Sequence, residues 1–319
     1  MIYSCGEIIA DMLENNDDSF QFCIGGAPLN LAYTISSLGG EVKCIGNVGN
    51  DVLGHKIVDF IKESKMDTKY IYIDNKRNTS MSFVTHKADG ERFFTFARKN
   101  GADYNIPNEF LKSLNECNII HIGSLLLSTK EGLKFVNKLI KKAKRLNIKI
   151  SLDINYRSDL FSTTEEAKSI YNKIISKCDI LKFSKDEVQL FSGVDDVYQG
   201  IKLITKPNQK VFITLGKEGS FLLSNNTVYK EPSISVKPID TTGAGDAFYG
   251  CVLYYIDYIG FDKFFEKEAI IRSAIQKANI CGAYATTKKG ALGCILNRYD
   301  LDKIYGDYYK KTNTIEDDF

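Results

Sequence analysis

Hydrophobic residues along this 319-residue chain follow two patterns, short continuous runs and longer segments with a helical period. Short apolar runs predict buried strands, whereas longer segments with an apolar residue at every third or fourth position predict helices packed on a core. Repeated strand–helix units are typical of a mainly parallel sheet with helices on both faces. The pattern predicts strands at residues 2–5, 42–45, 119–122, 148–154, 180–183 and 211–215, and helices beginning near residues 27, 51, 129, 164, 245 and 266.

One part of the chain interrupts this arrangement with a β-rich pattern. Two such runs, 79–86 and 92–97, flank the pair Asp89-Gly90, which is a strong hairpin signal. Residues 11–18 are polar and acidic, as in a turn or an exposed hairpin. We predict a single α/β domain that carries a small β lid. The predicted domain spans residues 1–319, and its lid spans about residues 10–24 and 68–98.

Composition narrows the class of protein. Hydrophobic residues make up 44% and charged residues 26% of the chain, as in ordinary globular domains. The net charge of +2, from 42 basic and 40 acidic residues, argues against nucleic acid as a partner. Eight cysteines without a Cys-x-x-Cys pair, beside three histidines, give no zinc-binding pattern. Without a signal-peptide pattern or an apolar run long enough to span a bilayer, we expect a cytoplasmic enzyme.

The chemistry is concentrated where the helix near residue 245 begins. Gly243, Ala244 and Gly245 are small enough for backbone N–H groups to converge on an anion, and the helix dipole favours negative charge there. Asp246 follows directly. A carboxylate at this position repels phosphate, so its presence needs a reason, and the chemical reason is a base that takes a proton from a hydroxyl attacking phosphorus. The alternative is that Asp246 only caps the helix. No Gly-x-x-x-x-Gly-Lys-Ser/Thr loop occurs in the chain.

The stretch DTTGAGDAFYG at residues 240–250 resembles the C-terminal signature of the ribokinase-like carbohydrate kinases, the phosphofructokinase B-type family. The resemblance implies a three-layer α/β/α sandwich with a β-sheet lid, and ATP, Mg²⁺ and K⁺ as cofactors. It also implies that Gly243, Ala244 and Gly245 form an anion hole and that Asp246 is the catalytic base.

A second stretch, GGAPLN at residues 25–30, resembles the sugar-binding signature of the same family. The resemblance makes Gly25, Gly26 and Asn30 candidates for contact with sugar hydroxyls. It also points to Asp11 as a carboxylate that grips two hydroxyls, although an acidic surface hairpin would show the same sequence.

The segment DINYR, residues 153–157, resembles the Asp-x-Asn-x-Arg segment of fructokinases and 2-keto-3-deoxygluconate kinases. Asp153 and Asn155 are then substrate-binding candidates, and Arg157 would stabilise charge on the transferred phosphoryl group. A surface salt bridge would explain Arg157 equally. The phrase ending at Arg98 resembles the lid of fructokinases, which implies that Arg98 approaches the substrate.

Further residues are assigned to nucleotide and metals by the same resemblance. Ser184 stands where the family usually has Asn, and Ser184 with Glu187 also matches a capping box, which explains both residues without function. Cys294 stands where ribokinases often have Ser. The implied nucleotide-binding residues are Lys182, Thr214, Gly216, Gly219, Gly243, Gly245 and Asn279; the implied metal-binding residues are Glu187 for Mg²⁺ through water, and Asp240, Thr242, Ala285 and Gly290 for a monovalent cation.

These features together predict an ATP-dependent sugar kinase, with fructose as the expected acceptor. A 2-keto-3-deoxygluconate kinase is the nearest alternative, since Arg98 and Arg157 offer partners for a carboxylate. A nucleoside kinase is disfavoured because no aromatic pair is evident near Asp11. A catalytically silent regulatory protein is disfavoured by the intact residues 243–246. Phe94 and Phe96 share one face of the lid, and we expect a homodimer formed through it.

Overall fold

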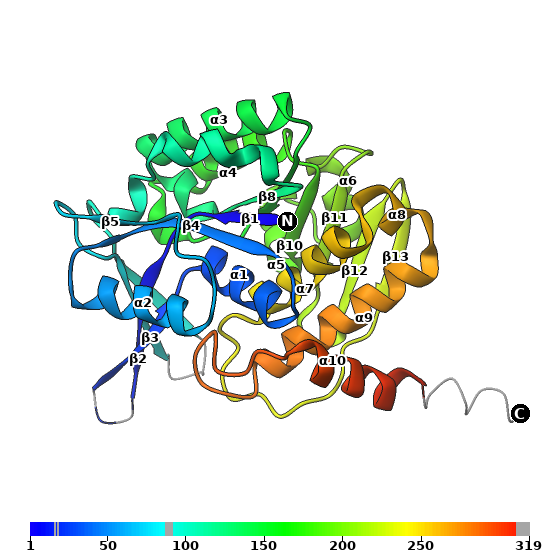
Figure 1. Cartoon of the computed structure of the whole chain (residues 1–319). Coiled ribbons are helices and arrows are strands. Elements are labelled where there is room, and N and C mark those ends of the chain that lie inside the picture. Colours follow the sequence, from blue (N-terminus) through cyan, green and yellow to red (C-terminus); the bar gives the residue numbers. More distant parts are fainter. Residues whose placement is uncertain (16, 18, 87–91, 311–319) are drawn as a thin grey trace, which may run out of the picture.

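The computed structural model describes residues 1–15, 17, 19–86 and 92–310. Its centre is a nine-stranded sheet in the order β13-β12-β11-β10-β9-β8-β1-β4-β5, parallel except at β12 (Figure 1). This agrees with the predicted parallel architecture. The strands are β1 (Ile2–Cys5), β4 (Val42–Gly49), β5 (Ile71–Asp74), β8 (Ile119–Ile122), β9 (Lys149–Asp153), β10 (Ile180–Ser184), β11 (Lys210–Thr214), β12 (Ser220–Ser224) and β13 (Thr227–Glu231).

Successive apolar residues of each strand enter different cores, because side chains alternate between the faces of a sheet. Leu181, for example, packs on one side of the sheet and Ile180 on the other. Two helical layers cover these faces, as Figure 1 shows. One layer holds α3 (Lys130–Arg145), α4 (Thr164–Ile175), α5 (Lys185–Ser192) and α6 (Val197–Ile204); the other holds α1 (Ala27–Ser37), α2 (Val52–Glu63), α7 (Ala244–Ile259), α8 (Phe261–Glu266), α9 (Glu268–Ala285) and α10 (Arg298–Tyr305).

A separate four-stranded sheet in the order β3-β2-β6-β7 forms the lid. Part of the segment expected in the lid belongs elsewhere, because β5 pairs with β4 in the main sheet. The hairpin expected around residues 11–18 is formed, because β2 pairs antiparallel with β3, but Asp11 lies within β2 and is buried rather than exposed. The Asp89-Gly90 pair lies outside the described residues. The lid strands are β2 (Ile9–Glu14), β3 (Phe20–Gly25), β6 (Met81–His86) and β7 (Arg92–Ala97).

Helices α1 and α7 pack closely on each other beneath the lid. A Cβ on Gly250 would lie 2.9 Å from Cβ of Thr34, so the two backbones approach where α7 carries no side chain. This approach brings the first turn of α1 beside the first turn of α7, which are the two places where the sequence concentrates its polar chemistry. Within the described part of the chain, no helix is both long and apolar enough to cross a bilayer.

Candidate active site

Two hollows meet at the carboxyl ends of the parallel strands, where ligands of such sheets bind. The first has a volume of about 650 Å³ and lies between the lid and the main sheet. The second, of about 570 Å³, lies between the β11 end of the sheet and α9. Both are lined by Pro238, Thr241 and Gly245, so a ligand in one can touch a ligand in the other at the start of α7.

The start of α7 has the geometry of an anion site. Gly243 is the N-cap residue with φ of 78°, and a Cβ there would lie 2.7 Å from Cα of Ala291, so only glycine fits. Gly243 and Gly245 line the first hollow, and Ala244 and Gly245 line the second. A helix start leaves backbone N–H groups without partners inside the helix, and with the helix dipole these attract an anion at this junction. Here the Ala244 N–H donates to the Thr241 carbonyl at 3.3 Å.

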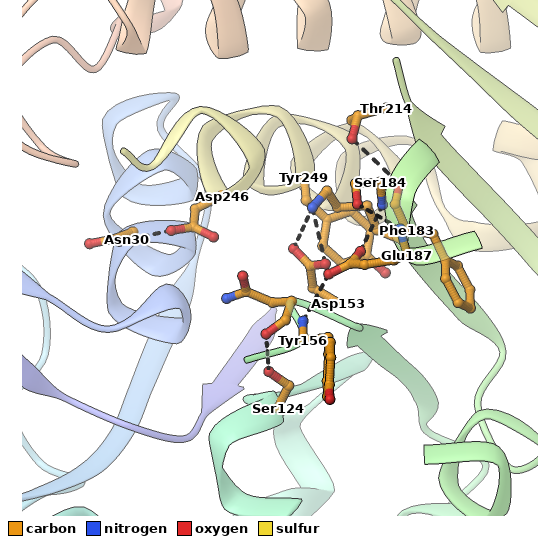
Figure 2. A network of polar contacts seen from close by, with 12 residues as sticks. Asn30, Ser124, Asp153, Tyr156, Phe183, Ser184, Glu187, Thr214, Asp246 and Tyr249 are labelled. Atoms are coloured by element: carbon orange, nitrogen blue, oxygen red, sulfur yellow. Dashed lines mark hydrogen bonds and ion pairs between the residues drawn. The ribbon is translucent and has the colours of Figure 1, made fainter. Parts of the chain in front are cut away.

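Asp246 points toward α1 from the first turn of α7 (Figure 2). One carboxylate oxygen accepts a hydrogen bond of 2.8 Å from the Asn30 side-chain amide. Burial raises the pKa of Asp246, while Asn30, Lys182 and Arg157 act in the opposite direction. A carboxylate with a raised pKa that reaches the cavity is suited to take a proton from a hydroxyl. The N-cap residue of α7 is Gly243 and the helix begins at Ala244, so Asp246 does not occupy the N-cap position that a mere capping role would require.

Lys182 is the buried cation of the site. Its Nζ lies 3.0 and 2.8 Å from the two carboxylate oxygens of Asp153, and both side chains are almost fully buried. Burial lowers the pKa of Lys182, but the carboxylates of Asp153, Glu187 and Asp246 outweigh this and raise the pKa overall, so Lys182 stays charged. A Cβ on Gly245 would lie 2.9 Å from this Nζ. Lys182 therefore lines the first hollow at the anion site, while Asp153 stands behind it.

The end of β9 places two further predicted residues on the cavity wall, Asn155 and Arg157. Asn155 has φ of 37°, a conformation that non-glycine residues adopt rarely and mostly at functional sites. The Arg157 guanidinium lies 5.2 Å from the ring centre of Phe94 in the lid and donates to the Tyr156 carbonyl. Arg157 forms no salt bridge among the described residues, so the surface ion pair considered above is not seen.

The lid contributes Asp11 to the same cavity. Asp11 accepts a hydrogen bond from the Ser82 hydroxyl on the neighbouring strand, and burial raises its pKa to about 6. Gly25 lies in the neighbouring strand β3, where it pairs with Ile9, and a Cβ on Gly25 would overlap the Asp11 carboxylate. Gly25 thus leaves space for the carboxylate, whereas Gly26, with φ of 109°, is on the cavity wall itself.

Arg98 does not occupy the place expected for it. It is 2% exposed and is absent from the residues that line the cavity. Its guanidinium pairs with the buried Asp103 and also donates to the Leu125 carbonyl and the Ser128 hydroxyl. Arg98 therefore ties the end of β7 to the main domain. This arrangement gives no direct contact between Arg98 and a ligand in the cavity.

The second hollow gathers the residues expected at the nucleotide. Thr214, Gly216 and Gly219 line it where β11 ends, and Asn279 lines it from α9. The Asn279 amide donates to the Glu231 and Pro232 carbonyls and accepts from the Ser220 hydroxyl. Asn279 therefore holds β12, β13 and α9 together at this wall. A direct contact between Asn279 and an adenine stays a prediction.

The capping box predicted at the start of α5 is formed. One Glu187 carboxylate oxygen accepts from the Ser184 backbone N–H at 2.7 Å, and the other accepts from the Tyr156 N–H at 2.8 Å (Figure 2). Both oxygens thus hold backbone donors, and Glu187 is not among the residues that line either hollow. Contact between Glu187 and a metal through water stays a prediction. Within the described ranges, no cluster of three or more acidic, histidine or cysteine side chains could hold a metal ion.

The residues assigned to a monovalent cation lie together beside the anion site. The Asp240 carboxylate accepts from the Thr242 backbone N–H and hydroxyl and from the Gly290 N–H. The Asp240 N–H donates to the Thr286 carbonyl at the end of α9, next to Ala285. These contacts join the loop before α7 to the loop after α9, which fits a cation held mainly by backbone oxygens.

A comparison with known proteins decides the family. The sequence profile of the pfkB family carbohydrate kinases matches residues 2–298. The chain belongs to this family.

The similar proteins support this assignment. A fructokinase from Vibrio alginolyticus is 30% identical over 310 residues, covering 96% of this chain and 99% of that protein. The crystal structure of a Vibrio cholerae fructokinase with fructose, ADP and calcium ion has a TM-score of 0.85, 29% identity and coverage of 95% and 97% of the two chains. A double mutant of the latter, with fructose, ADP and potassium ion, has a TM-score of 0.84, 30% identity and the same coverage.

Three features of the site in this pfkB kinase were missed at the level of sequence. The first is the Lys182–Asp153 ion pair, although a lysine inside the apolar run 180–183 is a signal that something pairs with it. The second is Ser82. It lies opposite Asp11 in the pairing of β2 with β6, so the two side chains are on the same face of the lid sheet. The third is Glu7, which lines the cavity although no sequence pattern assigns it a role.

Proposed function

We propose that this protein is an ATP-dependent sugar kinase that transfers the γ-phosphoryl group of ATP to a hydroxyl of a sugar, with D-fructose converted to fructose 6-phosphate. One observation carries the proposal: two ligand-sized hollows meet at Gly245, with the base candidate Asp246 on the wall of the lid-side hollow. The V. cholerae fructokinase structure, with fructose and ADP bound, supports a sugar and a nucleotide as the two ligands.

In this mechanism Asp246 removes the proton from the sugar hydroxyl while the hydroxyl oxygen attacks the γ-phosphorus. The bond to the β-phosphate oxygen breaks and ADP leaves. The N–H groups at 243–245, the Lys182 ammonium and the Arg157 guanidinium oppose the charge on the phosphoryl oxygens. Such donors, fixed before the reaction, need no reorganisation during it.

Metal ions are part of the proposal. Mg²⁺ bound to the ATP phosphates would supply further charge neutralisation, with Glu187 facing its water shell. A monovalent cation, K⁺, would lie near Asp240, Thr242, Ala285 and Gly290. The calcium and potassium ions bound in the V. cholerae fructokinase structures support the use of metal ions.

The alternatives are separated by their demands on the cavity. A 2-keto-3-deoxygluconate kinase needs a cationic partner for the substrate carboxylate, and the position of Arg98 leaves Arg157 for that task. A nucleoside kinase gains support, because Phe94 and Phe96 both line the cavity that holds Asp11. The absence of an aromatic pair was therefore a wrong reason to disfavour nucleosides. A silent regulatory protein would not require the assembled site at 243–246.

A substrate panel tests the proposal. Fructose, ribose, adenosine and 2-keto-3-deoxygluconate are each incubated with ATP and Mg²⁺, and ADP release and phosphorylated product are measured. We expect the highest kcat/KM with fructose. Preferential turnover of another acceptor would reassign the substrate but keep the kinase. No ADP release with any acceptor would support the regulatory protein.

We propose further that the protein is a cytoplasmic homodimer joined through its lid. The lid is a four-stranded sheet, and such a thin layer is stabilised when a second surface covers its outer side. The residues expected to form the dimer face, Phe94 and Phe96, line the cavity instead. Phe20 on β3 is 40% exposed and packs edge-on against Phe83 of β6. Light scattering tests this. A monomer at and above the assay concentration would refute it.

A further inference from the structure

Glu7 stands between β1 and the lid strand β2, and it is the buried acid of the cavity that has no assigned task. The side chain is 1% exposed, yet it belongs to the wall of the lid-side hollow together with Asp11 and Asn30. Neither carboxyl oxygen has a hydrogen-bond partner on another described residue. A buried polar group without partners is costly, so such a group is expected to have a ligand or a function.

The donors near Glu7 are already engaged. Its Oε2 lies against the backbone of Gly123, since a Cβ there would come within 2.3 Å of it, but the Gly123 N–H donates to the Cys5 carbonyl. Arg98 lies close enough to lower the pKa of Glu7, but its Nε and Nη1 donate to Asp103, Leu125 and Ser128. Its Nη2 forms an ion pair with Asp103 and makes no hydrogen bond to Glu7. A carboxylate in this position would be a buried charge without a hydrogen bond from another residue, whereas a neutral carboxyl avoids that cost.

We propose that Glu7 is a sugar-binding residue that carries a proton and donates a hydrogen bond to an oxygen of the hydroxyl-rich substrate. This inference rests on the proposed function, because it assigns a ligand to the same cavity. Glu7 and Asp11 then have opposite roles. The charged Asp11 accepts hydrogen bonds from hydroxyls, and the neutral Glu7 supplies the donor that a sugar oxygen needs.

The charges around Glu7 agree with this assignment. Burial raises the pKa of Glu7 to about 8, and the carboxylates of Asp103 and Asp246 raise it further, against the influence of Arg98. The groups that face it from neighbouring elements are Arg98, Asp103, Asp246, Cys5, Cys44 and Tyr171. Below pH 8 the carboxyl is mostly neutral, and above pH 8 it loses its proton and with it the ability to donate.

Calorimetric titration of the best sugar of the panel, without ATP, in two buffers of different ionisation enthalpy at pH 8, measures proton uptake on binding. We expect the wild-type protein to take up a fraction of a proton per sugar, because part of the free Glu7 is ionised there and regains its proton on binding. Glu7→Gln, which cannot ionise, is expected to take up none. The surface variant Glu63→Gln on α2 is the matched control and should behave as wild type.

Kinetics give a second readout that does not depend on Glu7→Gln alone. The wild-type KM for the sugar should rise between pH 7 and pH 9, and that rise should be absent in Glu7→Gln. Glu7→Leu removes the donor, so its sugar KM should rise roughly tenfold, the worth of one hydrogen bond, with the KM for ATP within about twofold.

Each outcome decides between explanations. A sugar KM that falls as pH rises from 7 to 9 would show an ionised Glu7 that accepts hydrogen bonds, and it overturns the proposal. Sugar affinity and proton uptake unchanged in both variants would mean that Glu7 only packs the fold. If the wild-type protein neither binds nor phosphorylates any sugar, the proposed function and this inference fall together. Turnover of a sugar that is equal in wild type and Glu7→Leu refutes the inference alone.

Discussion

The two ends of the lid-side cavity treat buried charge in opposite ways. At the α7 end, Lys182 is held by both carboxylate oxygens of Asp153 and remains charged. At the lid end, no cation of the described residues is bonded to Glu7 or Asp11. Burial raises the pKa of each, as it raises that of Asp153, but without a bonded ammonium group beside the carboxyl. The first end is suited to a charged phosphoryl group, and the second to uncharged hydroxyls. One cavity thus offers a separate environment to each of the two reacting groups.

The boundary between the two ends is Asp246, and removing its charge should have the largest effect. Asp246→Asn keeps the size and the contact with Asn30 but removes the base. We expect kcat to fall roughly 10²–10⁴-fold or more, while ATP affinity holds or rises because a negative charge near the phosphates has gone. Thermal stability should stay close to wild type.

Steady-state kinetics and a thermal melt check this prediction. Asp186→Asn, at an exposed position in the first turn of α5, is the control and should keep full activity. Near-normal turnover in Asp246→Asn would remove the base from the mechanism and leave the two ends without a reacting centre between them.

The charged end can be tested by separating its electrostatic role from its structural one. Lys182→Met leaves Asp153 buried without its partner, which should cost about 3–5 kcal/mol of stability. It should also lower kcat by roughly 10²–10³-fold, as when one donor to a transition-state charge is removed. The double variant Lys182→Met/Asp153→Leu should recover much of the stability, because the buried charge has gone, but not the turnover.

Urea unfolding and kcat of the single and double variants make the measurement. If the double variant regains wild-type turnover, Lys182 serves only to neutralise Asp153. The comparison between a charged end and a neutral end would then fail at its charged side.

At the lid end, Asp11→Asn should weaken sugar binding while leaving ATP binding unchanged. Hydrogen bonds to a charged group are worth about 1.5–3 kcal/mol, so we expect the sugar KM to rise roughly 10- to 100-fold. The wild-type KM should also rise as the pH falls through about 6, because Asp11 is then protonated. That trend is opposite to the one expected for Glu7 above pH 7.

Stability gives an independent check on Asp11. Its native pKa is raised above the ordinary value of 3.8, so its contribution to stability is greatest at low pH and declines as the pH rises from about 4 to about 6. Asp11→Asn should remove this decline from the pH dependence of urea unfolding. Asp262→Asn, at an exposed position of α8, should not. An unchanged sugar KM in Asp11→Asn would remove Asp11 from the site.

The smallest effect is expected for Ser184→Asn, at the start of α5 behind the charged end of the cavity. Ser184 caps α5, and asparagine caps about as well, so stability should change by less than about 0.5 kcal/mol. Because Glu187 is held by backbone donors in either case, the Mg²⁺ dependence of kcat should shift by no more than about twofold. A large shift in the Mg²⁺ titration would mean that residue 184 contacts the metal or its water.

The architecture could be predicted from the sequence because it depends on local signals: short apolar runs indicate the strands, and helix-period patterns indicate the helices. The anion site is likewise a prediction from a local signal, the small residues before α7, and the structure places the meeting point of two hollows beside them. The orientation of Arg98 could not be predicted, since it depends on Asp103 and on a carbonyl of a distant loop. The same is true of the buried Glu7. Burial of a single charged residue depends on which elements pack around it, and no local pattern records that.

The hydrogen bond between Asn30 and Asp246 joins positions separated by 216 residues of chain. At a synthesis rate of about 5–20 residues per second, the first turn of α1 is therefore made of the order of ten seconds or more before Asp246 is added to the chain. Until then the face of α1 that α7 later covers, including Leu31 and Ile35, has no cover. We expect partly made chains to be the form most prone to aggregate or to need a chaperone, and the site to appear only near the end of folding.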